Sequence, residues 1–163
     1  MTEKPGSIAR ERTLRLLDQQ GVSYRLLPAS EPVYTVEAAA RQRGVVREEI
    51  VKSILLKDAE GRYAMACVTG EARVDPRRVR AELAGSWSRF HFANSDEIVA
   101  VTGCPMGAVT PVGMPESVPV LFDEAIMALP RVSISSGDLT LGIELSPSDL
   151  HEIAKAHVAR IRA

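Results

Sequence analysis

The feature that most constrains the fold is a pair of apolar segments joined by a short polar turn. The segments cover residues 52–57 (KSILLK) and 63–69 (YAMACVT), and residues 58–62 (DAEGR) supply the charges and the glycine of a hairpin turn. Strands joined by so short a turn run antiparallel. Residues 132–135 and 139–145 form a second predicted pair near the C-terminus. These pairs favour a mixed or antiparallel sheet over a doubly wound parallel one.

Helical patterns alternate with these strands. Helices are predicted over residues 7–20, 35–44, 76–85, 95–103, 123–129 and 147–162, with a helical turn at 47–51 and further strands at 22–27, 90–92 and 118–122. The residues expected to cap helices are Ser7, Thr35, Asp75, Ser95 and Ser146. No repeat, low-complexity segment or linker divides the sequence, so residues 1–163 are expected to form a single α/β domain.

Composition narrows the classes of function. The net charge is −1, from 20 basic and 21 acidic side chains, whereas a protein that grips nucleic acid non-specifically should be basic. DNA binding is therefore not expected. A local basic cluster is either a solvated face or a contact for an RNA backbone; it consists of Arg73, Arg77, Arg78 and Arg80.

The N-terminus is polar, and no apolar run approaches the roughly 20 residues that span a bilayer. The two cysteines, Cys67 and Cys104, are far apart and belong to no CxxC pair, as is typical of reduced thiols. These features predict a cytoplasmic protein with no membrane partner.

An apolar stretch rich in glycine and proline covers residues 101–113 (VTGCPMGAVTPVG). It has two interpretations. It is either a buried crossover loop with glycines in left-handed conformations, or a ligand-binding loop. In the second case Gly107 would let the backbone approach a ligand closely and Pro111 would fix the exit direction. Turn chemistry alone favours the buried crossover loop.

The sequence lacks the motifs of most known catalytic and cofactor-binding sites. The three histidines form no HExxH or Cys/His cluster, and no GxSxG elbow or phosphate-binding glycine loop is present, so neither a metal nor a cofactor is expected. Cys104 is expected to be a small buried hydrophobe rather than a nucleophile. Lys52 opens an apolar strand. It is either a solvated strand end or a cation that attracts a phosphate or carbonyl oxygen into a pocket.

Several of these features occur together in one order. Lys52-Ser53 opens a strand, Thr102-Gly103 and the pattern Gly107-x-x-x-Pro111 follow, and the tail reads PVLFDEAI…VSISSG…IELSPSDL. From about Tyr34 to its end, the chain resembles the YbaK/EbsC family and the related editing domain inserted in bacterial prolyl-tRNA synthetases. The resemblance implies a compact α/β domain with a mixed, mostly antiparallel and strongly curved sheet surrounded by helices.

The resemblance also implies a trans-acting aminoacyl-tRNA deacylase, a hydrolase with no cofactor. Lys52, Gly107 and Pro111 match the family's functional lysine and GxxxP loop. The substrate-binding residues it implies are Tyr34, Thr35, Ser53, Thr102, Gly103, Ala108, Val109, Thr110, Ser135, Ser136 and Gly137. Its partners would be the acceptor end of an aminoacyl-tRNA and prolyl-tRNA synthetase.

This activity fits the missing motifs, because an aminoacyl ester is already activated and needs only a positioned water and donors for the oxyanion. The apolar loop should leave a small pocket, so Ala, Cys or Ser on tRNA(Pro) is the expected substrate. The alternative is a non-catalytic module that binds an aminoacyl-adenosine-like ligand, a tRNA end or a protein. A third interpretation, a redox protein, requires a low-pKa thiol at Cys104.

Overall fold

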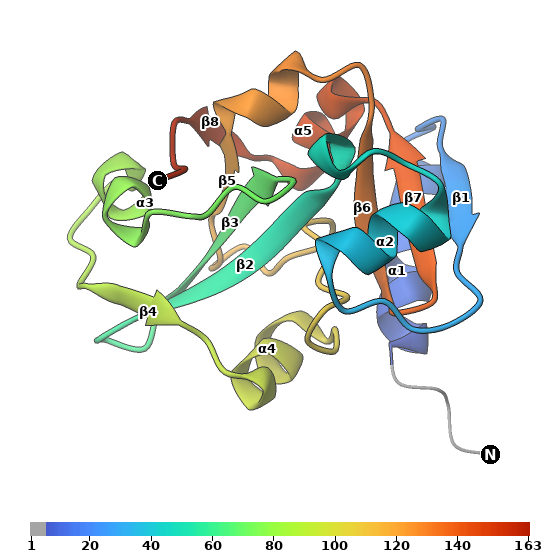
Figure 1. The fold of residues 1–163 in the computed structure, drawn as a ribbon. Helices are drawn as coiled ribbons and strands as arrows, with labels where there is room; N and C mark the ends of the chain where they lie inside the picture. The colour runs from blue at the N-terminus through green and yellow to red at the C-terminus, as the bar shows by residue number, and fades with distance from the viewer. Residues whose placement is uncertain (1–5) are drawn as a thin grey trace.

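Two sheets form the centre of the molecule (Figure 1). The structure, a computed structural model, describes residues 6–163. The larger sheet has the order β4-β2-β3-β5-β8, and its strands are β2 (Val51–Asp58), β3 (Tyr63–Thr69), β4 (Phe90–Phe92), β5 (Val120–Asp123) and β8 (His157–Ala159). The smaller sheet has the order β1-β7-β6, with β1 (Arg25–Pro28), β6 (Val132–Asp138) and β7 (Leu141–Leu145).

Five α-helices and two short 3-10 turns accompany the sheets within the described residues. They are α1 (Ser7–Gln19), α2 (Val36–Arg43), α3 (Pro76–Glu82), α4 (Ser95–Thr102), α5 (Pro147–Ala154), η1 (Arg47–Glu49) and η2 (Glu124–Ala128). All strand pairs are antiparallel except β3–β5 and β5–β8. The predicted mixed, mostly antiparallel α/β class is therefore confirmed. None of the helices between residues 6 and 163 has both the length and the apolarity that a bilayer crossing needs.

The β2–β3 hairpin has the expected turn. Its register runs from Val51 opposite Thr69 to Lys57 opposite Tyr63. The buried carboxylate of Asp58 accepts hydrogen bonds from two backbone N–H groups of the turn and from the guanidinium of Arg62. One polar side chain thus satisfies two backbone N–H groups of the turn, and the Asp58 carbonyl accepts a third from Gly61.

Two carboxylates should make the fold sensitive to acid. Burial acts to raise the pKa of Asp58, but the hydrogen bonds from Arg62 and Ser88 outweigh it and hold that pKa at about 2 instead of 3.8. The backbone N–H of Asn94 and the ammonium of Lys57 hold the pKa of Glu97 at about 2 instead of 4.5. Since both pKa values are lowered by folding, the stability they contribute is complete above pH 4.5 and is lost as the pH falls toward 2. Urea unfolding midpoints measured across this range should fall. An equal fall in the Asp58→Asn, Glu97→Gln double variant would contradict this assignment.

The alternation of β2 separates two cores. Val51 and Leu55 point into a core cluster on one face of the larger sheet, whereas Leu56 points into a second cluster on the other face. A third, small cluster of Val33, Ala39 and Ile50 lies beneath α2. Figure 1 shows α2 in front of β6 and β7, with α1 behind them.

The join between the two sheets positions the site. An isolated bridge pairs Ile50, just before β2, with Ser133 of β6. On the same edge, β4 pairs only with the far end of β2, from Leu56 to Asp58, and the Leu55 carbonyl accepts the Ala93 N–H. Between these contacts the edge of β2 borders a gap between the sheets.

The predicted end of the last helix is wrong. The helix was expected to reach residue 162, but α5 ends at Ala154, and Lys155 adopts a left-handed conformation with φ 53°. The chain then forms β8, which pairs parallel with β5. The cause is a tertiary contact: as a strand, residues 157–159 form hydrogen bonds with the edge of β5, which they could not form as part of a longer helix.

Smaller boundary errors have local causes. Gly6, not Ser7, occupies the N-cap of α1, and Asn94, not Ser95, caps α4 in a reciprocal capping box with Glu97. The capping roles of Thr35, Asp75 and Ser146 are confirmed. The strand predicted at 22–27 begins only at Arg25 and includes Pro28, and β6 extends to Asp138 instead of ending at residue 135.

Candidate functional site

A cavity of about 310 Å³ lies in the gap along the edge of β2. Five consecutive residues of β2, from Val51 to Leu55, line it. Because successive side chains of a strand point to opposite faces, only a cavity at the strand edge can touch all five. The other walls come from α2 and the segment before it, from Phe92 and Ala93, from the loop after α4 and from Ser135 of β6.

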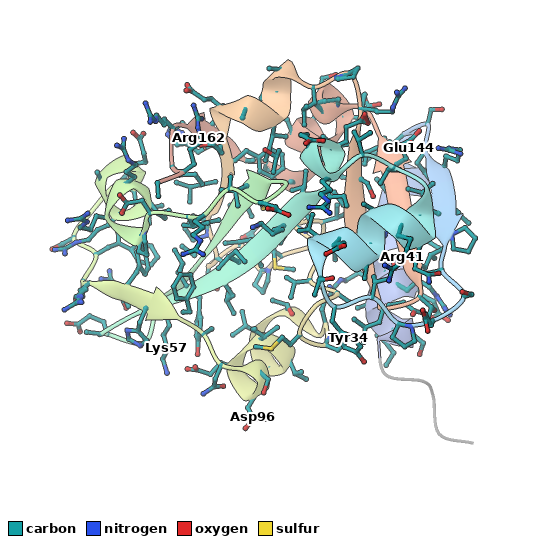
Figure 2. All side chains as sticks on the ribbon, in the orientation of Figure 1. Tyr34, Arg41, Lys57, Asp96, Glu144 and Arg162 are labelled. Atoms are coloured by element: carbon teal, nitrogen blue, oxygen red, sulfur yellow. The ribbon has the colours of Figure 1, made fainter. Side chains whose placement is uncertain are left out.

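Half of the site residues predicted from the sequence line this cavity. They are Tyr34, Thr35, Lys52, Ser53, Gly107, Val109 and Ser135. They come from four segments that lie far apart in the sequence and meet only in the folded chain. Figure 2 shows Tyr34 between α2 and the loop that follows α4.

The other predicted residues lie outside the cavity wall. They are Thr102, Gly103, Ala108, Thr110, Pro111, Ser136 and Gly137. Thr102 and Gly103 close α4, and the buried hydroxyl of Thr110 accepts the N–H of Val112 inside the loop. The Ser136 hydroxyl donates to the Leu141 carbonyl, and Gly137 packs against α1. These residues stabilise the segments to which the lining residues belong, but they do not line the cavity themselves.

The glycine- and proline-rich stretch combines both interpretations given above. Its glycines at 103, 107 and 113 all have positive φ angles, and residues 108–112 are buried, as expected for a crossover loop. Yet Met106, Gly107 and Val109 line the cavity. The loop is therefore both a buried connection and one wall of the site.

Gly107 lies at the mouth of the cavity. Its φ of 93° is one that side chains other than glycine rarely adopt. A Cβ atom there would lie 3.2 Å from Leu139 Cδ2 and 3.4 Å from Tyr34 Cδ1. A side chain at this position would strain the backbone and narrow the entrance.

Lys52 is half-buried in the wall. Its Nζ donates to the carbonyl of Ala72 at 2.7 Å and makes no ion pair with the described residues. Burial lowers the pKa of Lys52, an effect that Glu71 opposes and Arg73 reinforces. The amine keeps two further donors for a ligand.

None of the described residues that line the cavity is acidic, whereas two of them, Lys52 and Arg43, are cations. Three exposed apolar side chains stand at the same cavity: Tyr34 at 67%, Phe92 at 60% and Met106 at 53% exposure. A cavity with cations inside and exposed aromatic side chains around it suits a ligand that has both an anionic group and a flat ring.

The backbone of β2 adds hydrogen-bonding groups. The Leu55 carbonyl points toward the gap, where it accepts the Ala93 N–H. Because the backbone groups of alternate residues in a strand point the same way, the N–H and C=O of Ser53 also point into the gap. The Ser53 hydroxyl lies 3.4 Å from Cys67 Sγ on the neighbouring strand.

The sequence interpretation missed Arg43, Phe92 and Met106. A signal existed for Arg43, because it follows Val36 and Ala39 on the apolar face of α2, where an arginine is unusual. Phe92 and Met106 carry no such signal, since their positions depend on how the two sheets meet.

Neither cysteine should react in the folded protein. Cys104 is fully buried, with its Sγ beside the Thr102 carbonyl, and burial raises the pKa of Cys67 to about 12. Iodoacetamide should label both thiols only after denaturation, as read by mass spectrometry. Rapid labelling of native Cys104 would instead support the redox interpretation.

Among residues 6–163, no group of three or more His, Cys, Asp or Glu residues is placed to hold a metal ion.

The sequence model of the aminoacyl-tRNA editing domain matches residues 30–153, a range that contains the whole cavity. The chain belongs to this family. The resemblance to this family that the sequence suggested is thus confirmed.

Individual relatives support the assignment over nearly the full length. The chain is 26% identical over 154 residues to the prolyl-tRNA editing protein ProX of Acetoanaerobium sticklandii, covering 91% of this chain and 92% of that one. It is 23% identical over 167 residues to the multifunctional Ser/Thr-tRNA deacylase ProXp-y of Escherichia coli K12, covering 99% and 98%. A crystal structure assigned to a trans-editing enzyme for prolyl-tRNA synthetase superposes with a TM-score of 0.79 at 25% identity, covering 99% of each chain.

Proposed function

We propose that this protein is a trans-acting deacylase that hydrolyses the ester of a tRNA mischarged with a small amino acid, Ala, Cys or Ser, on tRNA(Pro). One observation carries the proposal. In a chain of the editing family, Lys52 and the Gly107 loop line one cavity, and none of its lining residues within 6–163 is acidic.

The cavity suits the 3′ end of an aminoacyl-tRNA. Its volume of about 310 Å³ is at the low end for a small-molecule site. A cavity of this size would hold a small acyl group, with the nucleoside bound at its mouth. The Lys52 ammonium would bind the terminal phosphate or the ester carbonyl. Tyr34 and Phe92 would stack against the adenine base. Pro111, which lies behind the wall, would hold the Gly107 loop rigid.

The reaction needs no enzyme nucleophile. A bound water attacks the ester carbonyl carbon, and the negative charge that develops on the carbonyl oxygen is stabilised by the Lys52 ammonium and by backbone N–H groups of the cavity edge. The bond between the acyl carbon and the ribose oxygen then breaks, and the proton from the water passes to that oxygen. The products are the free amino acid and an intact tRNA with its ribose hydroxyl restored.

A panel of charged tRNAs tests the proposal. Ala-, Cys- and Ser-tRNA(Pro) should include at least one ester that is cleaved faster than spontaneous hydrolysis, while Pro-tRNA(Pro) should remain stable as the control. Release of labelled amino acid measures each rate. Failure to accelerate any of the three mischarged esters would overturn the proposed function.

Recognition should concentrate on the acceptor end. In the basic cluster, the Nε atoms of Arg77 and Arg78 both lie 3.6 Å from the carboxylate of Asp75, which offsets part of the charge that the cluster offers to the rest of the tRNA. An acceptor-stem minihelix carrying the same ester should therefore be hydrolysed with a kcat/KM within about tenfold of the full tRNA. A loss of several hundredfold would show that the tRNA body is an essential contact.

A further inference from the structure

Arg43 is a buried cation that pairs with no carboxylate among residues 6–163. It is only 8% exposed and lies at the C-terminal end of α2, on the cavity wall. Its Nη1 donates to Ser133 Oγ at 3.1 Å and its Nη2 to Ser135 Oγ at 3.5 Å, and its Nε is buried with no hydrogen-bond partner in the described part of the chain. A guanidinium buried without a carboxylate destabilises the free protein. Burial correspondingly lowers the pKa of Arg43 to about 10.

Strand β7 leaves space for the Arg43 side chain. Gly142 of β7 lies under the guanidinium, where any side chain would collide with Nε and its neighbouring atoms. Gly142 is opposite Ser135 in the β6–β7 register, and Ser135, unlike the other serine bonded to Arg43, also lines the cavity. The absence of a side chain at position 142 thus lets Arg43 reach the cavity wall.

This end of the cavity presents mainly hydrogen-bond donors. A guanidinium can only donate, and the two serine hydroxyls already accept from it. A ligand oxygen there gains a charged hydrogen bond, whereas an alkyl group leaves the donor desolvated and a thiol is a weak acceptor. The positive charge also repels the α-ammonium of an aminoacyl group, which turns the amino acid side chain toward Arg43.

We propose that Arg43, together with Ser135, is a specificity-determining site that favours an acyl group with a side-chain hydroxyl, serine above all, over alanine and cysteine. The inference rests on the proposed function and narrows its substrate class. A hydrogen bond to a charged group corresponds to about a 10- to 150-fold preference for Ser over Ala in kcat/KM.

The test compares Ser-, Ala- and Cys-tRNA(Pro) in the wild type and in Arg43→Met, which keeps the length of the side chain and removes the charge. The wild type should prefer serine at least tenfold, and in the variant the Ser/Ala ratio should fall toward one because serine activity drops. Arg41→Met is the matched control. Arg41 is an exposed residue of the same helix, labelled in Figure 2, and its loss should leave the ratio unchanged.

A binding measurement separates this inference from the proposed function. The seryl and alanyl amides of 3′-amino-3′-deoxyadenosine cannot be hydrolysed as esters, and calorimetry gives the ratio of their affinities with or without turnover. Tighter seryl binding that Arg43→Met abolishes would support the inference even if no ester were cleaved, an outcome that would overturn the proposed function alone. Equal binding and equal hydrolysis of the two acyl groups by the wild type would overturn the inference alone.

A second variant guards against misfolding of Arg43→Met. Ser135→Ala keeps the buried charge but removes the hydroxyl at the cavity wall, and it should lower the Ser/Ala ratio about three- to tenfold in a protein whose fold is verified by circular dichroism. A Ser/Ala ratio that stays at the wild-type value in both variants would show that this end of the cavity does not select the acyl group.

Discussion

Replacing Lys52 with alanine is expected to lower kcat/KM for the cleaved ester by about 10²- to 10³-fold. The ammonium lines the cavity without an ion-pair partner among the described residues, so its charge is available to the phosphate or the developing oxyanion. Since the only hydrogen bond that its ammonium makes with the described residues is to the Ala72 carbonyl, the fold should survive the substitution. Steady-state hydrolysis together with far-UV circular dichroism measures both effects.

Lys57→Ala is the matched control for this variant. Lys57 lies near the other end of the same strand, where it pairs with Glu97 and does not line the cavity. Its removal should affect stability but leave kcat/KM within about twofold of the wild type. If folded Lys52→Ala retained wild-type activity, or if both variants lost activity equally, Lys52 would not act in the reaction.

Gly107→Ala should lower both the stability and the activity of the protein. Its φ of 93° makes a side chain at this position cost about 1–2 kcal/mol of stability, and the added methyl group would press on Leu139 and Tyr34 at the cavity mouth. Because a small displacement of a positioning loop disturbs the alignment of the substrate, we expect kcat/KM to fall by about 10- to 100-fold.

Gly61→Ala separates backbone strain from the effect on the cavity. Gly61 lies in the β2–β3 turn with φ 82°, and a Cβ there would meet nothing within 4 Å. Both variants should lower the unfolding midpoint in urea to a similar degree, but only Gly107→Ala should lose activity. Equal activity in the two variants would show that the conformation of the Gly107 loop does not affect the reaction.

The parts of the fold that the sequence predicted are those set by local chemistry. The β2–β3 turn follows from Asp58 and Gly61, and three caps follow from residues that bond their own helix, such as Thr35. β8 was missed because residues 157–159 become a strand only where β5 provides an edge. Local propensity contains no information about that edge.

The residues of the candidate site also fall into those that the sequence predicted and those that it missed. The Lys52 strand and the Gly107 loop form sequence patterns, so they could be selected before the fold was known. Arg43, Phe92 and Met106 reach the cavity because β4 covers only one end of β2 and β6 joins just before the other. That gap is a property of long-range strand register. Thr110 and Ser136 are close in sequence to lining residues, but their hydroxyls form hydrogen bonds with the Val112 N–H and the Leu141 carbonyl, and neither residue lines the cavity.

The most direct test of the central claim is the number of esters cleaved by each protein molecule. Mischarged Ser-tRNA(Pro) in at least tenfold excess over the protein is followed by release of labelled serine, with the ribose end of the tRNA checked for recharging. The account predicts many turnovers per molecule and a tRNA that accepts amino acid again. Release of no more than one serine per protein, or none beyond the spontaneous rate, would contradict it and indicate a module that binds the aminoacyl end without hydrolysing it.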